Sequence, residues 1–292
     1  MKEQPDARGD PSLRTAILFT VLALGFAVVY WVAVEMSRRG ILPFSLESDG
    51  FFRASLPGSV IGLVLRDFGP ALAGVIALAA CQGRASLAEL GRSLVRWRVP
   101  AWLYVAAWFG IVLNLGIVIA GYATGSLRFD PSAFAPLKFV MLFFVMAVFD
   151  GPLGEEIGWR GVLLPQLLRR MSPLAAAIVV GIVWYAWHVP LYAADDKLPG
   201  LVDHATFLYT CVALSVIMTW FFLKSGVSTF LMVYLHDASN YSTFLRFKLF
   251  PKVAASPVPT VVYAVLMLVL AVAAAVALVR HGQRVAKSQH AT

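Results

Sequence analysis

Four side chains of this sequence have the chemistry needed to activate water and attack an amide: Glu155, His188, His236 and Asn240. Each lies in or beside a long apolar segment, where ionisable groups are costly and usually face a protein interior. A buried carboxylate is a suitable general base, and an imidazole can hold the same water molecule from its other side. A second imidazole and an amide can donate hydrogen bonds to an oxyanion. The four residue types therefore fit peptide-bond hydrolysis.

Polar and aromatic residues recur four positions apart at three places, and residues with this spacing share one face of a helix. The pairs are Glu156 with Arg160, Trp184 with His188, and His236 with Asn240. We expect Glu156 and Arg160 to form a supporting ion pair that matters mainly for stability. This interpretation leaves Glu155 as the candidate base.

The same donors are also compatible with a metal site, because carboxylates and imidazoles are good zinc ligands. In that version Glu155, His188 and His236 would hold the ion. The HExxH signature of soluble zinc proteases does not occur in the sequence. We favour the metal-free version, because Asn240 lies one turn from His236 and an amide suits an oxyanion better than zinc.

The segments that carry these residues predict a helical hairpin. The sequence RRMSP at 169–173 is typical of a tight turn, and Pro173 can start a new helix. If 153–170 and 173–192 run antiparallel, Glu155 and His188 stand at the same height, roughly 25 Å from the turn. His236 lies about ten residues into its own segment, at a similar depth. We therefore expect the three side chains to converge.

Composition predicts that these helices cross a membrane. The 292 residues are 60% hydrophobic and 14% charged, whereas soluble domains carry about 25% charged residues. The mean hydropathy is +0.77. We expect an all-α, polytopic membrane protein with about eight transmembrane helices, since about 20 apolar residues span the bilayer. The segments are 13–35, 57–80, 100–122, 134–155, 173–192, 204–223, 227–247 and 257–279.

The net charge of +8 is explained by Lys and Arg at the ends of spans, where they act as topology signals, and no nucleic-acid partner is expected. Basic stretches at 92–98, 169–170 and 280–287 fall on one side of the membrane together with the N-terminus. We predict a multi-pass protein of the cell membrane with both termini cytoplasmic. Its expected partners are the lipid bilayer and a peptide or protein substrate in the membrane.

One transmembrane domain is expected over 13–280, between polar terminal segments at 1–12 and 281–292, with its motifs at 150–240. Residues 85–99 have apolar positions at helical spacing and arginines on the other face, which predicts an amphipathic helix in the interface. The two cysteines, Cys81 and Cys211, form neither a disulfide framework nor a CxxC metal motif.

Three motifs resemble those of the CPBP family of intramembrane proteases, also called the Abi or type II CAAX prenyl endopeptidase family. EEIGWR (155–160) matches the family's EExxxR, WYAWH (184–188) resembles FxxxH with Trp184 in place of Phe, and HDASN (236–240) matches HxxxN. The surroundings GPLGEEIGWRG, WHVPL and FGPALAG look like bacterial members. Three motifs in order within a polytopic chain make the resemblance specific.

The resemblance implies an all-helical membrane protein that cleaves peptide bonds near or within the bilayer. Glu155 and His188 would activate water, His236 and Asn240 would stabilise the oxyanion, and Glu156 would support the site together with Arg160. A prenylated protein, a leader peptide or a membrane-protein fragment would be the substrate. The Trp184 departure would concern the shape of the pocket more than its chemistry.

Two other functions use the same buried charges. A transporter or channel would use them for proton or ion coupling, and a break at GPLG (151–154) would suit it. A catalytically silent membrane scaffold is the third interpretation. Convergence of Glu155, His188, His236 and Asn240 around one water-sized space would favour the protease.

Overall fold

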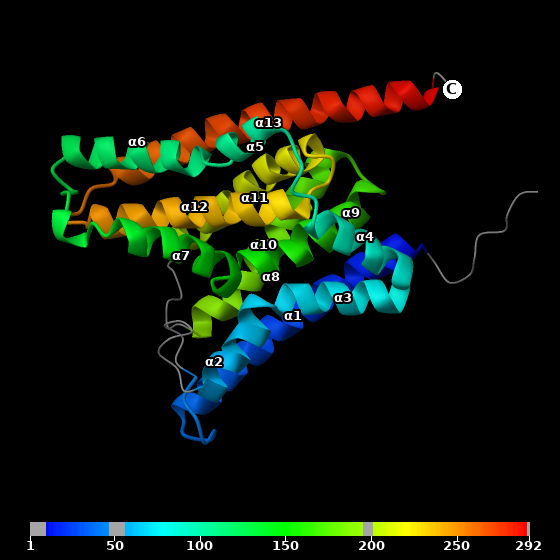
Figure 1. Ribbon diagram of the computed structural model, residues 1–292, viewed down its shortest axis with the longest axis horizontal. Coiled ribbons are helices and arrows are strands. Elements are labelled where there is room, and N and C mark those ends of the chain that lie inside the picture. The colour runs from blue at the N-terminus through cyan, green and yellow to red at the C-terminus, as the bar shows by residue number, and fades with distance from the viewer. Residues whose placement is uncertain (1–9, 47–55, 195–200, 291–292) are drawn as a thin grey trace, which may run out of the picture.

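The computed structural model describes residues 10–46, 56–194 and 201–290. Within these ranges every regular element is helical (Figure 1), and one isolated bridge joins Leu127 to Lys252. The predicted all-α fold is confirmed. Most of the N-terminal polar segment and the last two residues of the chain lie outside the described residues.

The first half of the chain forms α1 (Pro11–Arg38), α2 (Leu56–Gly62), the π-helical turn η1 (Leu63–Asp67), α3 (Gly69–Cys81), α4 (Arg84–Leu94), α5 (Ala101–Ala106), α6 (Phe109–Ala123) and the 3-10 turn η2 (Pro131–Ala133). The second half forms α7 (Pro136–Phe149), α8 (Pro152–Gly158), the π-helical turn η3 (Trp159–Leu163), α9 (Leu164–Leu168), α10 (Pro173–Ala194), α11 (Leu201–Lys224), α12 (Thr229–Leu249) and α13 (Val258–His290).

Six helical segments of the described chain are long and apolar enough to cross a membrane, or seven if the pair α2–η1 and α3, bent by 57°, counts as one span. The predicted number of about eight was therefore approximate. The segment that accounts for the difference is α12, which is helical over 229–249 but carries several polar and charged residues. The protein is a multi-pass membrane protein, and its most polar long helix also carries the third motif.

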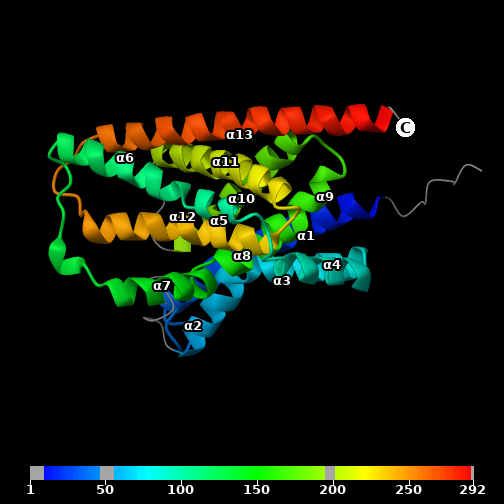
Figure 2. The ribbon, with the colours of Figure 1, turned by 45° about the horizontal axis from the view of Figure 1, so that its top comes forward.

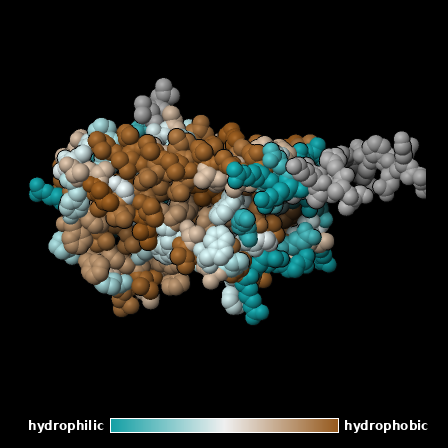
Figure 3. Space-filling model, turned by 90° about the horizontal axis from the view of Figure 1, so that it is seen from above, coloured by the Kyte–Doolittle hydropathy of each residue, from teal (hydrophilic) through white to brown (hydrophobic). Residues whose placement is uncertain are grey.

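Polar contacts join the ends of α1 to the ends of neighbouring helices. Asp10 at the start of α1 pairs with Arg170 behind α9, whereas Arg38 at the end of α1 donates to the backbone oxygen of Ala194 at the end of α10. In Figure 1 the start of α1 and the end of α13 lie at the same end. Figure 3 shows hydrophilic residues gathered at that end and apolar residues over much of the remaining face.

The helices that carry the motifs lie in the middle of the bundle. α10 packs between α1 and α11, and α12 packs against α6, α7 and α8. In Figure 2, α11 lies beside α13, and α12 lies between α11 and α7. The predicted amphipathic helix is present as α4, but it ends at Leu94 rather than near 99.

Glycines allow the backbones of α3 and α8 to touch. A Cβ atom at Gly154 would lie 2.0 Å from the backbone oxygen of Asp67, and one at Gly158 would lie 2.6 Å from that of Pro70. Small residues permit such close approach between membrane helices, and dispersion contacts then stabilise it. The FGPALAG segment therefore forms the surface on which the first motif is built.

The arrangement of helix ends predicts the membrane topology. Reporter domains fused after residue 90, in α4, and after residue 194, at the end of α10, should report opposite sides of the membrane, because these positions lie at opposite ends of the bundle. Detection of both reporters on one side would contradict this arrangement.

Candidate active site

The first motif follows a break in the chain between α7 and α8. Gly151 has a φ of +99°, which L residues with a side chain rarely adopt. A Cβ atom at this position would also lie 2.5 Å from Oε1 of Glu155. Pro152 then starts α8 in the first helical turn, where proline is well tolerated. Gly151 therefore both ends α7 and leaves space for the Glu155 carboxylate.

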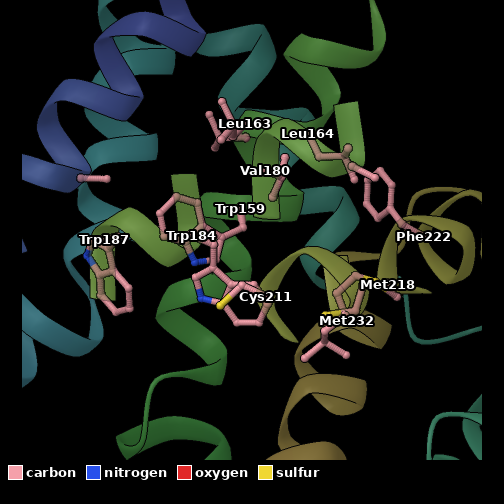
Figure 4. Close-up of a cluster of buried hydrophobic side chains, with 14 of the residues drawn as sticks. Trp159, Leu163, Leu164, Val180, Trp184, Trp187, Cys211, Met218, Phe222 and Met232 are labelled. Atoms are coloured by element: carbon pink, nitrogen blue, oxygen red, sulfur yellow. The ribbon is translucent and has the colours of Figure 1, made fainter. Parts of the chain in front are cut away.

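Glu155 is buried, with 6% of its surface exposed, and two indoles hold its carboxylate. Trp184 Nε1 donates to Glu155 Oε2 at 2.6 Å, and Trp159 Nε1 donates to the same oxygen at 3.3 Å. Figure 4 shows these two indoles close together in the buried hydrophobic cluster, with Trp187 nearby. The second carboxylate oxygen, Oε1, lies close to Gly151, where any side chain would meet it.

The role of Trp184 differs from the sequence-based interpretation, which assigned it to the shape of the pocket. Its indole donates the shorter hydrogen bond to Glu155, and phenylalanine could not do so because it has no N–H. The ring also stands over the Arg160 guanidinium at 4.8 Å. The departure from the family's phenylalanine thus adds a donor to the site. Only the tertiary packing reveals this contact.

Glu156 is fully buried and holds two partners on one oxygen. Its Oε1 accepts from Arg160 Nη1 at 2.7 Å and lies 2.9 Å from His236 Nδ1. The predicted Glu156–Arg160 pair is therefore present, but the prediction did not include His236. Since a carboxylate accepts and does not donate, this contact places a proton on Nδ1 of His236 and directs Nε2 away from Glu156.

His188 makes a complementary arrangement on α10. Its Nδ1 lies 2.9 Å from the backbone oxygen of Trp184, which can only accept. In the neutral ring, Nε2 therefore carries the free lone pair. The edge of the ring packs against Trp187 at 4.7 Å between centroids. Glu155 is close enough to interact electrostatically with His188 and also with His236.

The hairpin geometry is close to the prediction but shifted. Glu155 contacts Trp184, one turn before His188, rather than His188 itself. The π-helical turn η3 (Trp159–Leu163) lies between Glu155 and the hairpin turn, and a π-turn has more residues per turn than the α-helix that the arithmetic assumed. Glu155 consequently stands nearer to the turn than uniform α-helical rise predicts.

The third motif supplies two further polar groups on α12. Asn240 lies one turn beyond His236, is half-buried, and its side chain makes no hydrogen bond within the described residues. Asp237 is fully buried and both of its carboxylate oxygens lack a partner in the described chain.

Other acidic groups surround the site, and sequence reasoning did not connect them to it. Arg66 and Asp67 form an ion pair at 2.7 Å within η1. Asp67 interacts electrostatically with Glu155, and so does Asp150, which precedes the break at Gly151. The sequence offered one signal for Asp150. The Gly and Pro of GPLG (151–154) directly follow it, and such residues indicate that a helix ends there, next to the first motif.

The zinc version was tested against the geometry of these side chains. It requires Glu155, His188 and His236 to reach one ion at about 2.0–2.2 Å. In the described part of the chain no three His, Cys, Asp or Glu side chains are grouped so that they could hold a metal ion. As arranged, these side chains form no such group, and the proposal below uses the metal-free version.

The fold and site define a class: a multi-pass helical membrane protein with a buried glutamate held between two indoles and two histidines near it. Residues 136–242 match the family described as Type II CAAX prenyl endopeptidase Rce1-like. The chain is also 30% identical over 113 residues to "CAAX prenyl protease 2" of Methanococcus maripaludis, a match that covers 37% of this chain and 39% of that protein.

The matched segment, 136–242, contains all three motifs, and both matches agree with the resemblance that the motifs carry. The chain spans about two fifths of the length of the curated relative that it matches.

Replacement of Trp184 tests whether its indole positions Glu155. Trp184→Phe keeps an aromatic ring but removes the donor to Glu155, and a hydrogen bond to a charged group contributes about 1.5–3 kcal/mol. We expect the turnover rate to fall about tenfold or more. Trp187→Phe is the matched control, because the Trp187 indole N–H has no partner in the described chain. Equal rates for the two variants would contradict the assignment.

Replacement of Glu156 separates stability from positioning. Removing one partner of a buried pair costs about 3–5 kcal/mol, so Glu156→Gln should lower the melting temperature in detergent. Arg160→Lys should lower it as well, but by less, because lysine keeps the positive charge and loses only the guanidinium geometry. Glu156→Gln should also lower turnover, since it weakens the contact to His236, whereas Arg160→Lys keeps that contact. If both variants lost turnover to the same extent, the contact with His236 would not account for the loss, and the role of Glu156 would be to stabilise the fold.

Proposed function

We propose that the protein is an intramembrane endopeptidase that hydrolyses a peptide bond with water activated by Glu155 and His188. The observation that supports this most directly is the fixed orientation of Glu155. Two indoles engage its Oε2, and Oε1 stays available on the side that Gly151 leaves open. An oriented carboxylate with one free oxygen, beside an imidazole, is the arrangement that a general base for water requires.

In the proposed reaction a water molecule binds between Glu155 Oε1 and His188 Nε2. The Nδ1–H of His188 donates a hydrogen bond to the Trp184 carbonyl. The unprotonated Nε2 therefore accepts a hydrogen bond from the water. Glu155 takes the second water proton as the oxygen attacks the carbonyl carbon. The protonated Glu155 then returns this proton to the leaving amine, so that the carboxylate is regenerated at the end of each cycle.

His236 and Asn240 are proposed to stabilise the oxyanion of the tetrahedral intermediate. The Nδ1–H of His236 donates to Glu156. A protonated His236 then presents Nε2–H to the oxyanion, and the buried Glu156 carboxylate compensates the positive charge of the ring. The Asn240 side-chain amide supplies a second donor from one turn further along the same helix. Donors that are oriented in advance lower the barrier most in a site that excludes water.

We propose a membrane-associated peptide as the substrate, and the name of the curated relative favours a prenylated one. A prenyl chain or an apolar leader segment would bring the scissile bond to the bundle from within the bilayer. We further propose that the protein resides in the cell membrane with both termini in the cytoplasm.

The proposal is tested by cleavage of prenylated and unprenylated peptides by the purified protein. Glu155→Gln should remove nearly all turnover while the melting temperature in detergent stays close to that of the unchanged protein, since Gln can still accept both indole hydrogen bonds. A strong chelator should leave activity intact. Cleavage at the unaltered rate by Glu155→Gln would exclude Glu155 as the base, and reversible loss with chelator would require a metal.

A further inference from the structure

A cavity lies away from the catalytic candidates, where α6, α12 and α13 meet. Its volume is about 380 Å³, and its lining includes Asn114, Thr243, Arg246 and Lys252. Neither Glu155, His188, His236 nor Asn240 lines it. None of the residues that line it is acidic, so two cationic side chains face a cavity without a carboxylate.

Arg246 is oriented by neutral groups only. Its Nε donates to Asn114 Oδ1 at 3.0 Å, and its guanidinium stands 3.7 Å from the centroid of the Phe247 ring. Asn114 is itself buried within α6 and fixed by donating to the Gly110 backbone oxygen at 2.8 Å. Both Nη groups of Arg246 make no hydrogen bond within the described residues. A half-buried guanidinium with this geometry is prepared to bind an anion with two oxygens.

The second cation is held in place by the backbone. Lys252 forms the isolated antiparallel bridge with Leu127, and the next residue, Val253, donates its N–H to the Ser126 oxygen at 2.9 Å. These contacts join the segments that follow α6 and α12. The loop that carries Lys252 is therefore tied to the loop after α6, and Lys252 lines the cavity from this fixed backbone.

The surroundings favour a lipid as the source of the anion. The cavity lies at the end of the apolar helices, which is the level of lipid headgroups in a bilayer. The same helices expose apolar side chains, among them Ile119 of α6 and Val261 of α13. Acyl chains could lie against these side chains while the headgroup enters the cavity. Basic pockets between transmembrane helices bind anionic headgroups in this way.

We propose that this cavity binds the phosphate headgroup of an anionic phospholipid through Arg246 and Lys252. Two phosphate oxygens pair with the Arg246 fork, and the Lys252 ammonium approaches the headgroup from the rim. The bound headgroup would lie away from the peptide bond that is cleaved. Arg246 lies ten positions beyond His236 on α12, which is about 15 Å along the helix axis. The site therefore does not depend on the proposed protease function.

The test compares lipid binding to the purified full chain in neutral detergent, measured by native mass spectrometry. The probes are dioleoylphosphatidylglycerol, dioleoylphosphatidylcholine and inorganic phosphate. The unchanged protein should bind the anionic lipid about tenfold more tightly than the zwitterionic one, as expected for one charge-assisted contact. Arg246→Gln and Lys252→Gln should each remove most of this preference, and Arg246→Lys should keep part of it.

Lys248→Gln is the matched control, because Lys248 is an exposed cation near Arg246 on α12 that does not line the cavity. It should keep the full preference. If Arg246→Gln fails to fold, Lys252→Gln still tests the site, since Lys252 is exposed. The proposal is overturned by an equal loss in Lys248→Gln or by no loss in Lys252→Gln. Binding of inorganic phosphate as tight as that of the lipid would assign the site to free phosphate instead. Normal lipid binding with weakened peptide cleavage in Lys252→Gln would assign the cavity to substrate.

Discussion

Two adjacent carboxylates buried among apolar helices must each find their own partners, and the centre of this protein is arranged around that constraint. Successive residues on a helix point in directions about 100° apart, so Glu155 and Glu156 face different neighbours. Glu155 meets two indole N–H groups, and Glu156 meets a guanidinium and an imidazole. Each carboxylate is therefore engaged on one oxygen, Glu155 by neutral indole donors and Glu156 by groups that can carry positive charge.

This division explains why α8 must lie so close to α3. The glycines at 154 and 158 bring the α8 backbone onto the segment around Asp67 and Pro70, and larger residues there would move the whole turn that carries both carboxylates. The π-helical turn η3 follows directly and carries Arg160. Close backbone contact on one side and a widened turn on the other together set the direction in which Glu155 and Glu156 point.

Aromatic side chains form much of the remaining wall of the site. The Trp184 ring packs edge-on against His236 at 5.3 Å, and Trp159 packs against Trp187 at 5.8 Å. Such rings fill volume, and their N–H groups can satisfy polar atoms that would otherwise be costly to bury. The site is thus apolar in most of its lining and polar at a few oriented atoms, which suits a reaction that must exclude bulk water.

The sequence by itself determined the all-α membrane class, the three motifs and the pairing of Glu156 with Arg160, because hydrophobic length and i,i+4 spacing are local properties of a chain. It also gave the approximate height of Glu155 on its hairpin. The tertiary structure decided which side chains meet. The contact of Trp184 with Glu155, the contact of Glu156 with His236 and the shift of one turn along α10 all depend on how separate helices face one another. Spacing along one helix cannot specify the rotation of the next, and the π-turn at 159–163 has no local sequence signal that we recognised.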